Sequence, residues 1–296
     1  MNQTMQSLLE KGIKALEERG IPEPALDARY LLLEAFEMDT AHFLLERSRP
    51  LPQEEKTRER VRRYQEMIKQ REMRVPLQQI LGNQEFMGLN FQVNHHVLIP
   101  RQDTETLVEL VLNEQKDKHA SILDMCTGSG CIAVSLAALG GYERVAAVDL
   151  SGEALKVAEE NRNRILGEEG KGRVSFFQGD LFQALDRNMS PFHILVSNPP
   201  YIPTSVIGGL EPEVRDFEPR MALDGSQDGL MFYRRIARES QPYLCPQAAV
   251  YLEIGWDQGR AVKEILEENG FCQVRVIKDA PGKDRVAAAV WPGESE

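Results

Sequence analysis

Residues 122–149 decide the fold class, and they read ILDMCTGSGCIAVSLAALGGYERVAAVD. An apolar run at 122–125 leads into a glycine-containing turn, which is followed by a helical pattern at 131–139 and a second apolar run at 145–149. Two apolar runs connected by a helix are typical of parallel strands that are buried on both faces of a sheet. This stretch therefore predicts a parallel sheet with helices packed against it.

The same alternation continues towards the C-terminus. The segment that joins the last two expected strands, 279–284, has only six residues. Because this is too short for a helical crossover, the pair should be antiparallel. We therefore expect an α/β fold with a doubly wound, mostly parallel sheet and an antiparallel last strand. The further expected strands are 174–178, 193–197, 249–254, 273–278 and 285–291, and the further expected helices are 152–166, 230–241 and 258–269.

The N-terminal quarter of the chain has a helical pattern instead. Apolar residues at helical spacing occur near the N-terminus and again in 25–36, and a highly charged helix is expected over 53–74. Alternating apolar and polar residues around Gly88 predict a β-hairpin, and Asp103 fits the N-cap of the next helix. The buried face of the first helix should consist of Met5, Leu8, Leu9, Gly12 and Leu16. We expect three parts, a helical bundle over 1–75, a linker with the hairpin over 76–102, and the α/β domain over 103–296.

Composition narrows the class of partner. The 46 acidic and 35 basic side chains give a formal net charge of −11, which argues against a protein that mainly neutralises nucleic-acid phosphates. The four cysteines form no C-x-x-C pair, so free thiols are expected, without a disulfide framework or a metal site. Glu10 interrupts the amphipathic N-terminus and no run of about 18 uncharged apolar residues occurs, so neither a signal peptide nor a membrane span is expected. These features favour a cytoplasmic protein with small-molecule or protein partners.

The turn after the first expected strand is a candidate cofactor site. Gly128 and Gly130 have no Cβ, so the backbone and a ligand can approach closely. Dinucleotide, nucleotide and adenosyl sites share such a turn with ordinary tight turns. The dinucleotide fingerprint needs a further glycine at position 133, which is alanine here, and the Lys-Ser/Thr pair of a P-loop is missing. A ligand without phosphates is therefore favoured, and S-adenosylmethionine is such a ligand.

Two aspartates end the next expected strands. Asp149 lies nineteen residues after Gly130, where a carboxylate can bind both hydroxyls of an adenosine ribose. Asp180 follows the third strand and could accept a hydrogen bond from the adenine amino group. Asp180 equally fits the N-cap of a helix, and the sequence leaves both roles open.

The sequence Asn198-Pro199-Pro200-Tyr201, which we call the NPPY motif, follows the fourth expected strand. Two prolines stiffen the backbone and leave carbonyl groups free. The Asn198 side-chain oxygen and the Pro199 carbonyl could accept both hydrogens of a planar –NH2 group, while Tyr201 stacks on its plane. The alternative is a proline-rich turn with a capping asparagine.

An NPPY motif beside an adenosyl site resembles the methyltransferases that modify planar amino nitrogens. Further stretches resemble one family among them, the release-factor glutamine methyltransferases (HemK/PrmC family), along nearly the whole chain. The chain departs from that family at Cys126, a position that is usually glycine, and at Gln102, which is commonly proline. The stretches that carry the resemblance are Phe86-Met87-Gly88, VLIPRQDTE at 97–105, the NPPY motif with Ile202, DGSQDGL at 224–230, Glu253-Ile254-Gly255 and GKDRV at 282–286.

The resemblance implies a class I S-adenosylmethionine-dependent (Rossmann-like) methyltransferase domain. The methyl acceptor would be the side-chain amide nitrogen, N5, of the glutamine in the Gly-Gly-Gln motif of class I peptide chain release factors, with S-adenosylhomocysteine as product. The catalytic residues would be Asn198, Pro199 and Tyr201. These three residues and Pro200 would bind the substrate. The helical bundle would recognise the protein substrate. The predicted cofactor site comprises Leu98, Arg101, Cys126, Thr127, Gly128, Ser129, Gly130, Asp149, Leu150, Asp180, Leu181 and Asn198.

Two alternative functions are compatible with parts of the same pattern. An adenine-N6 or guanine-N2 nucleic-acid methyltransferase could use the same motif on a flipped base, but the negative net charge disfavours it. A non-catalytic adenosyl-binding protein is a different class, and for it we would expect a disrupted NPPY motif. No direct contact with nucleic acid or membrane is expected.

Overall fold

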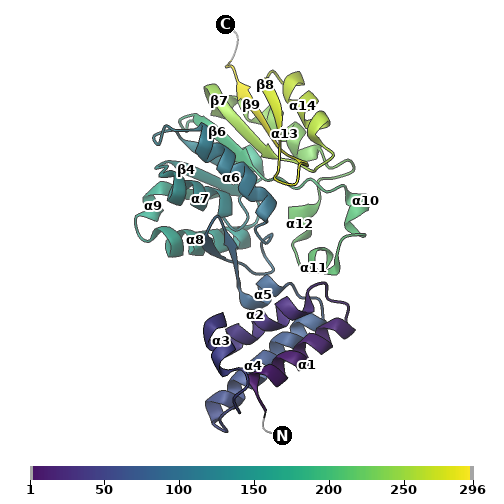
Figure 1. Cartoon of the computed structure of the whole chain (residues 1–296). Helices are drawn as coiled ribbons and strands as arrows, with labels where there is room; N and C mark the ends of the chain where they lie inside the picture. The colour runs from purple at the N-terminus through teal and green to yellow at the C-terminus, as the bar shows by residue number, and fades with distance from the viewer. Residues whose placement is uncertain (1–2, 294–296) are drawn as a thin grey trace. The chain divides into compact units, whose positions relative to one another are not determined.

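The computed structural model describes residues 3–293 and divides into two compact units (Figure 1). The first unit contains the chain up to Gly82 together with the distant segment Glu211–Phe217, and the second contains Asn83–Leu210 and the chain from Glu218 onward. Among the described residues, no helix combines the length and the apolar character that crossing a membrane requires.

The first unit is a bundle of helices around one apolar core. The buried residues of α1 are the five expected, from Met5 to Leu16, and they pack with apolar residues of α2 and α4. A Cβ at Gly12 would collide with the Tyr64 ring of α4, so glycine permits this close helix contact. The helices are α1 (Met5–Glu18), α2 (Pro24–Phe36), α3 (Thr40–Glu46), α4 (Glu55–Glu72), α5 (Leu77–Leu81) and, in the distant segment, α11 (Pro212–Arg215).

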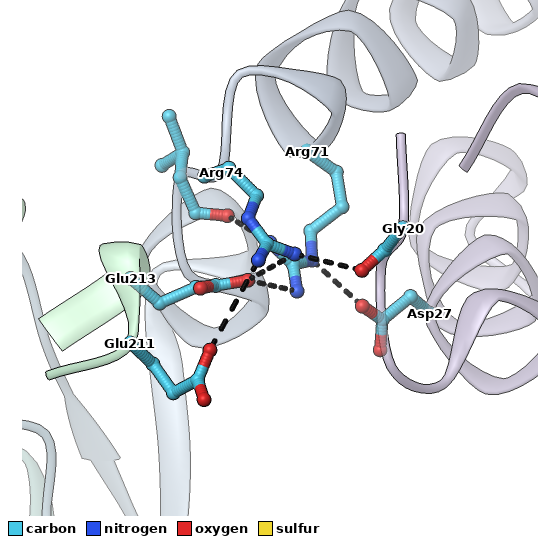
Figure 2. A network of polar contacts seen from close by, with 7 residues as sticks. Gly20, Asp27, Arg71, Arg74, Glu211 and Glu213 are labelled. Atoms are coloured by element: carbon cyan, nitrogen blue, oxygen red, sulfur yellow. Dashed lines mark hydrogen bonds and ion pairs between the residues drawn. The ribbon is translucent and has the colours of Figure 1, made fainter. Parts of the chain in front are cut away.

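A buried ion network fastens the distant segment inside this unit (Figure 2). Arg71 of α4 donates from Nε to Asp27 Oδ2 at 2.7 Å and from Nη2 to Glu213 Oε1 at 2.8 Å. The side chains of Arg71, Asp27 and Glu213 are only 6, 9 and 16% exposed. Arg74 adds an ion pair to Glu213 at 3.4 Å and a hydrogen bond to the Gly20 carbonyl at 3.0 Å. Glu213 is thereby tied to α4 and to the turn that follows it, and through Arg71 to Asp27 of α2, all more than a hundred residues earlier.

The second unit begins with the expected hairpin and continues as a seven-stranded sheet. The hairpin pairs β1 (Asn83–Phe86) with β2 (Leu89–Gln92). The sheet has the order β5-β4-β3-β6-β7-β9-β8, in which β9 is antiparallel to both of its neighbours. This confirms the doubly wound sheet and the antiparallel last strand. The sheet strands are β3 (Ile122–Met125), β4 (Val145–Asp149), β5 (Val174–Gln178), β6 (Phe192–Ser197), β7 (Leu244–Glu253), β8 (Cys272–Lys278) and β9 (Asp284–Trp291).

Helices cover both faces of this sheet (Figure 1). The buried apolar residues of α6 and α7 pack against one face, and those of α13 and α14 pack against the other. The helices of this unit are α6 (Gln102–Glu114), α7 (Cys131–Gly140), α8 (Gly152–Leu166), α9 (Gly170–Arg173), α10 (Thr204–Ile207), α12 (Arg220–Leu223), α13 (Met231–Glu239) and α14 (Gly259–Glu268), with 3₁₀ turns η1 (Leu181–Ala184) and η2 (Gln241–Tyr243).

The start of α6 corrects one expectation. Its N-cap residue is Arg101, and Asp103 lies within the first helical turn. Asp103 therefore does not cap the helix. Its Oδ2 instead forms an ion pair with Arg285 Nη2 of β9 at 2.8 Å, a long-range partner that local pattern cannot reveal.

Candidate active site

A cavity of about 270 Å³ opens at the carboxyl ends of the central strands of the second unit. Met125 and Asp149 reach it from the ends of β3 and β4, and Asn198 follows β6. Open α/β sheets bind ligands at this edge, where the strand order reverses. The cavity is lined by His96, Val97, Leu98, Met125, Cys126, Gly128, Val148, Asp149, Leu150, Ser151, Ala154, Gly179, Asp180, Leu181, Asn198, Pro200, Pro219, Met221, Ala222, Asp224 and Phe232.

The glycine turn after β3 is held by Asp124, to which the sequence analysis assigned no role. Asp124 is fully buried, and its Oδ2 accepts hydrogen bonds from Thr127 Oγ1 at 2.6 Å and from the Ala133 amide at 3.1 Å. Burial raises the pKa of Asp124 to about 7, against the opposing effect of these hydrogen bonds. Gly128 and Gly130 have φ values of +56° and +78°, which glycine adopts without strain. In the sequence, the signal that could have indicated this role was a single carboxylate within an otherwise apolar strand.

Asp149 connects this turn to the end of β4. Its Oδ2 accepts from the Gly128 amide at 2.8 Å, and its Oδ1 accepts from the Ser151 amide at 2.9 Å. Burial raises its pKa, whereas these backbone hydrogen bonds lower it. Each carboxylate oxygen has a second lone pair. The side chain can therefore accept from two ligand hydroxyls while it keeps the turn in place.

Asp180 also lines the cavity, and its side chain already has a partner. Its Oδ1 accepts from Arg235 Nη1 of α13 at 2.8 Å. The residue stands at the N-cap position of η1, but its side chain makes no capping hydrogen bond. The N-cap alternative therefore describes the position of Asp180 and not the contact that its carboxylate makes.

Cys126 lies in the cavity wall with φ at +64°, a conformation that favours glycine. A residue with a Cβ is therefore held here in a backbone conformation that glycine would adopt with less strain. Burial raises the pKa of its thiol well above the usual range, and the nearby carboxylates of Asp149 and Asp124 raise it further. The thiol stays protonated at neutral pH and is a poor nucleophile.

The NPPY motif is supported by glycines from a later part of the chain. A Cβ at Gly225 would lie 2.8 Å from the Tyr201 Cα, and one at Gly229 would collide with the Tyr201 carbonyl oxygen. Gln258 Nε2 donates to the same carbonyl oxygen at 2.9 Å. The segment around Gly225 can therefore pack directly on the motif backbone.

Hydrogen bonds to two buried residues orient two side chains of the motif. Asn198 Nδ2 donates to Thr104 Oγ1 of α6 at 3.2 Å, which leaves Asn198 Oδ1 as a free acceptor at the cavity. Tyr201 Oη donates to Glu253 Oε1 at the end of β7 at 3.3 Å. Thr104 and Glu253 are 2% and 1% exposed. Sequence analysis assigned neither a role, because each lies far from the motif in sequence.

Arg101 is engaged outside the cavity. Its Nη2 donates to both carboxylate oxygens of Glu218, at 2.7 and 2.8 Å. Burial raises the pKa of Glu218, and the Arg101 charge lowers it. Because Glu218 immediately precedes the cavity-lining Pro219, Arg101 anchors one wall of the cavity.

The structure brings most of the predicted cofactor residues to one cavity. Leu98, Cys126, Gly128, Asp149, Leu150, Asp180, Leu181 and Asn198 all line it, as does Pro200 of the NPPY motif. The cavity wall does not include the other predicted residues, which are Arg101, Thr127, Ser129, Gly130, Pro199 and Tyr201. Lining residues that the sequence analysis missed include Pro219, Met221, Ala222 and Phe232. Within residues 3–293, no cluster of three or more His, Cys, Asp or Glu side chains could hold a metal ion.

Comparison with known domains and structures defines the class of this protein. Family models match at residues 7–82, the PrmC N-terminal domain, and at 102–206, the methyltransferase small domain. A solved methyltransferase from Pyrococcus furiosus aligns with 71% of this chain and 91% of its own, with a TM-score of 0.51 and 18% identity. The fold is that of a class I S-adenosylmethionine-dependent methyltransferase.

Full-length relatives narrow the class to one family. The release factor glutamine methyltransferase of Geobacter sulfurreducens is 39% identical over 283 residues, covering 96% of this chain and 95% of the relative. That of Moorella thermoacetica is 42% identical over 285 residues, covering 95% and 96%. The chain belongs to the release factor glutamine methyltransferase family.

Proposed function

We propose that this protein transfers a methyl group from S-adenosylmethionine to the side-chain amide nitrogen of the glutamine in the Gly-Gly-Gln motif of class I peptide chain release factors. It would thereby support translation termination. The observation that carries this proposal is the orientation of Asn198, whose Nδ2 is held by Thr104 so that Oδ1 remains an acceptor at the cavity. An amide N–H is the donor that such an oxygen would bind.

The cavity residues suit S-adenosylmethionine. Asp149 offers carboxylate lone pairs for ribose hydroxyls, and Gly128 leaves open space, since a Cβ there would meet no atom within 4 Å. Leu98, Leu150 and Leu181 supply apolar surface for an adenine ring. Thr127, Ser129 and Gly130 would act by shaping the turn. When bound, this cofactor supplies an electrophilic methyl group on a sulfonium ion.

The protein must activate a weak nucleophile, because the lone pair of an amide nitrogen is delocalised into its carbonyl. Acceptance of the two N–H hydrogens by Asn198 Oδ1 and the Pro199 carbonyl would stabilise the positive charge that develops on nitrogen. The rigid NPPY motif would also fix the direction of the lone pair, and orientation of this kind contributes about 7–11 kcal/mol in favourable cases. Tyr201 would pack along the amide plane. A general base is not required, since the nitrogen can release its proton after it has become positively charged.

The experiment compares acceptors under identical conditions. Purified protein and methyl-labelled S-adenosylmethionine are incubated with an unmethylated release factor, with the same factor carrying alanine in place of the Gly-Gly-Gln glutamine, and with RNA and DNA. We expect label only in the unmodified factor. Label in nucleic acid, with none in the release factor, would contradict the proposal and favour a base-modifying enzyme.

We further propose that the N-terminal helical unit, expected over 1–75, recognises the protein substrate. A Gly-Gly-Gln loop alone offers little surface, whereas specific protein pairs bury about 1,200–2,000 Å². Helix α4 carries seven basic and four acidic residues, a net charge of 7 − 4 = +3 in a chain of net charge −11. Its exposed basic side chains, among them Arg58 and Arg62, could contact an acidic surface of the partner.

A charge-reversal pair tests this role. Arg58→Glu with Arg62→Glu should raise KM for the intact release factor and leave KM for a short Gly-Gly-Gln peptide unchanged. Arg260→Glu is the matched control, because Arg260 is an exposed arginine on α14 of the other unit. Equal KM values for the intact factor in native and doubly reversed protein would exclude this face of α4 from recognition.

A further inference from the structure

The side-chain amide of Gln258 lies where three stretches of the second unit meet. Gln258 is buried at the N-cap position of α14. Its Oε1 accepts from the Gly255 amide at 2.9 Å. Its Nε2 donates to the Tyr201 carbonyl at 2.9 Å and, less closely, to the Gly229 carbonyl at 3.4 Å. One buried amide therefore connects the NPPY motif with the DGSQDGL stretch and with the end of β7.

Two glycines make room for this amide. A Cβ at Gly229 would lie 2.7 Å from Gln258 Nε2, and a Cβ at Gly255 would lie 2.9 Å from Gln258 Oε1. A side chain at either position would therefore displace the amide. Both glycines belong to stretches that carry the family resemblance, and the place of Gln258 gives a physical reason for them.

The surrounding groups allow only one orientation of the Gln258 amide. If the amide were flipped, its NH2 group would face the Gly255 N–H, and its oxygen would face the carbonyls of Tyr201 and Gly229. Two donors would then oppose each other, as would the acceptors, and unsatisfied polar groups are costly in a buried site. The donor end of Gln258 is therefore fixed on the Tyr201 carbonyl.

The backbone of the NPPY motif depends on how its two ends are held. Pro199 and Pro200 have no N–H to donate, and their φ angles are fixed by their rings. At the upstream end, Ser197 completes β6, and its Oγ donates to the last carbonyl of β3 at 2.6 Å. At the downstream end, Gln258 holds the Tyr201 carbonyl. Because few torsions between these ends are free, holding both ends sets the direction of the Pro199 carbonyl.

We propose that Gln258 is a positioning residue that holds the Tyr201 carbonyl and thereby directs the Pro199 carbonyl at the methyl-accepting amide. This inference rests on the proposed function, in which the Pro199 carbonyl accepts one of the two amide hydrogens. Gln258 does not line the cavity, so it acts without touching the cofactor. Its loss should therefore slow methyl transfer and leave cofactor binding close to native.

The kinetic test replaces the NH2 group of Gln258 by an oxygen. Gln258→Glu keeps the size of the side chain, but its ionised carboxylate has no donor for the Tyr201 carbonyl. We expect kcat to fall by at least about tenfold, since loss of one transition-state hydrogen bond costs ~10²–10³ in favourable cases. Cofactor affinity, measured by calorimetry, should stay close to native. Native kcat would overturn the inference, as would a loss of cofactor affinity as large as the loss of kcat.

Gln241→Glu is the matched control. Gln241 is a half-buried glutamine of the same unit, and its Nε2 donates to the Asn269 carbonyl at 2.9 Å. The change therefore removes the same kind of hydrogen bond at a place that does not touch the NPPY motif. Its kcat should be native. A fall in kcat as large as that of Gln258→Glu would show that the effect is not specific to the motif, and would overturn the inference.

The pH dependence of Gln258→Glu separates positioning from a general structural role. When it is protonated, the introduced carboxyl group has an O–H that can donate to the Tyr201 carbonyl, while its other oxygen accepts from the Gly255 amide. Protonation should therefore restore the hydrogen bonds of the native amide. Gln258→Met has no such group, so its kcat relative to the native protein should stay low at every pH.

The groups around Gln258 determine where this recovery occurs. Burial raises the pKa of a carboxyl group, and two neighbouring carboxylates outweigh one guanidinium in the same direction. The kcat of Gln258→Glu relative to native should accordingly rise as the pH falls from about 8 to about 6. A ratio that does not change with pH would overturn the inference. The titratable groups on the elements packed here are Tyr233 of α13, Glu253 of β7, and Asp284 and Arg285 of β9.

Circular dichroism at each pH measures whether the variants are folded. If Gln258→Glu does not fold, Gln258→Met takes its place, with the same expected fall in kcat and the same retained cofactor affinity, and native kcat in that variant would overturn the inference. A native protein that methylates no release factor would instead contradict the proposed function. The two failures are therefore distinguishable, because only the first leaves the native protein active.

Discussion

Asn198 is the residue on which the proposed chemistry depends most. Its side chain has one end held by Thr104 and the other free at the cavity. Asn198→Ala removes the acceptor for the substrate amide, so we expect kcat to fall by ~10²–10³, equivalent to about 2.7–4 kcal/mol. Cofactor binding, measured by calorimetry, should be largely retained. Turnover close to native in this variant would rule out Asn198 as a transition-state partner.

Asp149 is the corresponding residue for the cofactor. Both of its oxygens already accept a backbone hydrogen bond, from Gly128 and Ser151. Asp149→Ala removes the ribose acceptors and loosens the turn, and each lost charge-assisted hydrogen bond should weaken S-adenosylmethionine binding by about 1.5–3 kcal/mol. Calorimetry measures this directly, with Ser135→Ala as a buried control in the neighbouring helix. Unchanged affinity would mean that another group binds the ribose.

At the scale of elements, the parallel strands were the most predictable part of the molecule. β3, β4 and β5 have the expected bounds. β3 and β4 are buried on both faces and form continuous apolar runs, whereas β5 lies at the edge of the sheet and is only partly buried. Short helices were harder to predict from the sequence. Helix α3 was not expected, because its seven residues are too few to show a helical periodicity. In the structure Asp39 caps this helix by accepting a hydrogen bond from the His42 amide at 2.7 Å.

The candidate site was predictable where its residues follow strands directly. Asp149 and Asn198 could be placed at the cavity edge because the carboxyl ends of parallel strands meet there. Pro219, Met221 and Phe232 were missed, since their approach to the cavity depends on how a long irregular segment returns to the sheet. Thr104 and Glu253 were missed because only tertiary packing brings α6 and the end of β7 to the NPPY motif.

The ion pair of Arg101 and Glu218 makes a prediction about that irregular segment. The Glu218 side chain is 1% exposed, and Arg101 binds both of its oxygens. Arg101→Ala and Glu218→Gln should each weaken cofactor binding by releasing the wall around Pro219. The double variant should be no weaker than the weaker single one, a coupling of about 0.5–3 kcal/mol.

Calorimetry on the three proteins distinguishes an anchor from a direct ligand. If Glu218→Gln binds the cofactor as the native protein does while Arg101→Ala binds it poorly, Arg101 contacts the cofactor itself. That outcome would support the cofactor-binding role that the family resemblance implied for Arg101.

At the scale of the whole molecule, the segment Glu211–Phe217 is the main feature that sequence could not predict. The chain leaves the α/β unit after Leu210, folds with the N-terminal unit and returns at Glu218. The partners of this segment lie more than a hundred residues earlier, and the buried Arg71 joins it to Asp27 (Figure 2). No local sequence pattern indicates such a contact, because nothing in the sequence distinguishes Arg71, which is buried, from the exposed charged residues of α4.

Arg71 should therefore matter more for stability than other arginines of α4. Arg71→Ala leaves the Asp27 carboxylate buried without its partner and leaves Glu213 with only its longer pair to Arg74, so we expect the free energy of unfolding to fall by about 3–5 kcal/mol. Arg58→Ala is the control, since its pair with Glu55 is 60 and 66% exposed and should contribute about 0–1 kcal/mol. Urea unfolding followed by circular dichroism measures both. Equal stability losses would show that the network is not effectively buried in solution.

The central claim concerns a single atom, the amide nitrogen of one glutamine. The most direct measurement is tandem mass spectrometry of an unmethylated release factor after incubation with this protein and S-adenosylmethionine carrying a labelled methyl group. The account predicts one labelled methyl group on the side chain of the Gly-Gly-Gln glutamine, and none when Asn198→Ala replaces the native enzyme. A release factor that remains unmodified, or a methyl group located on any other residue, would contradict it.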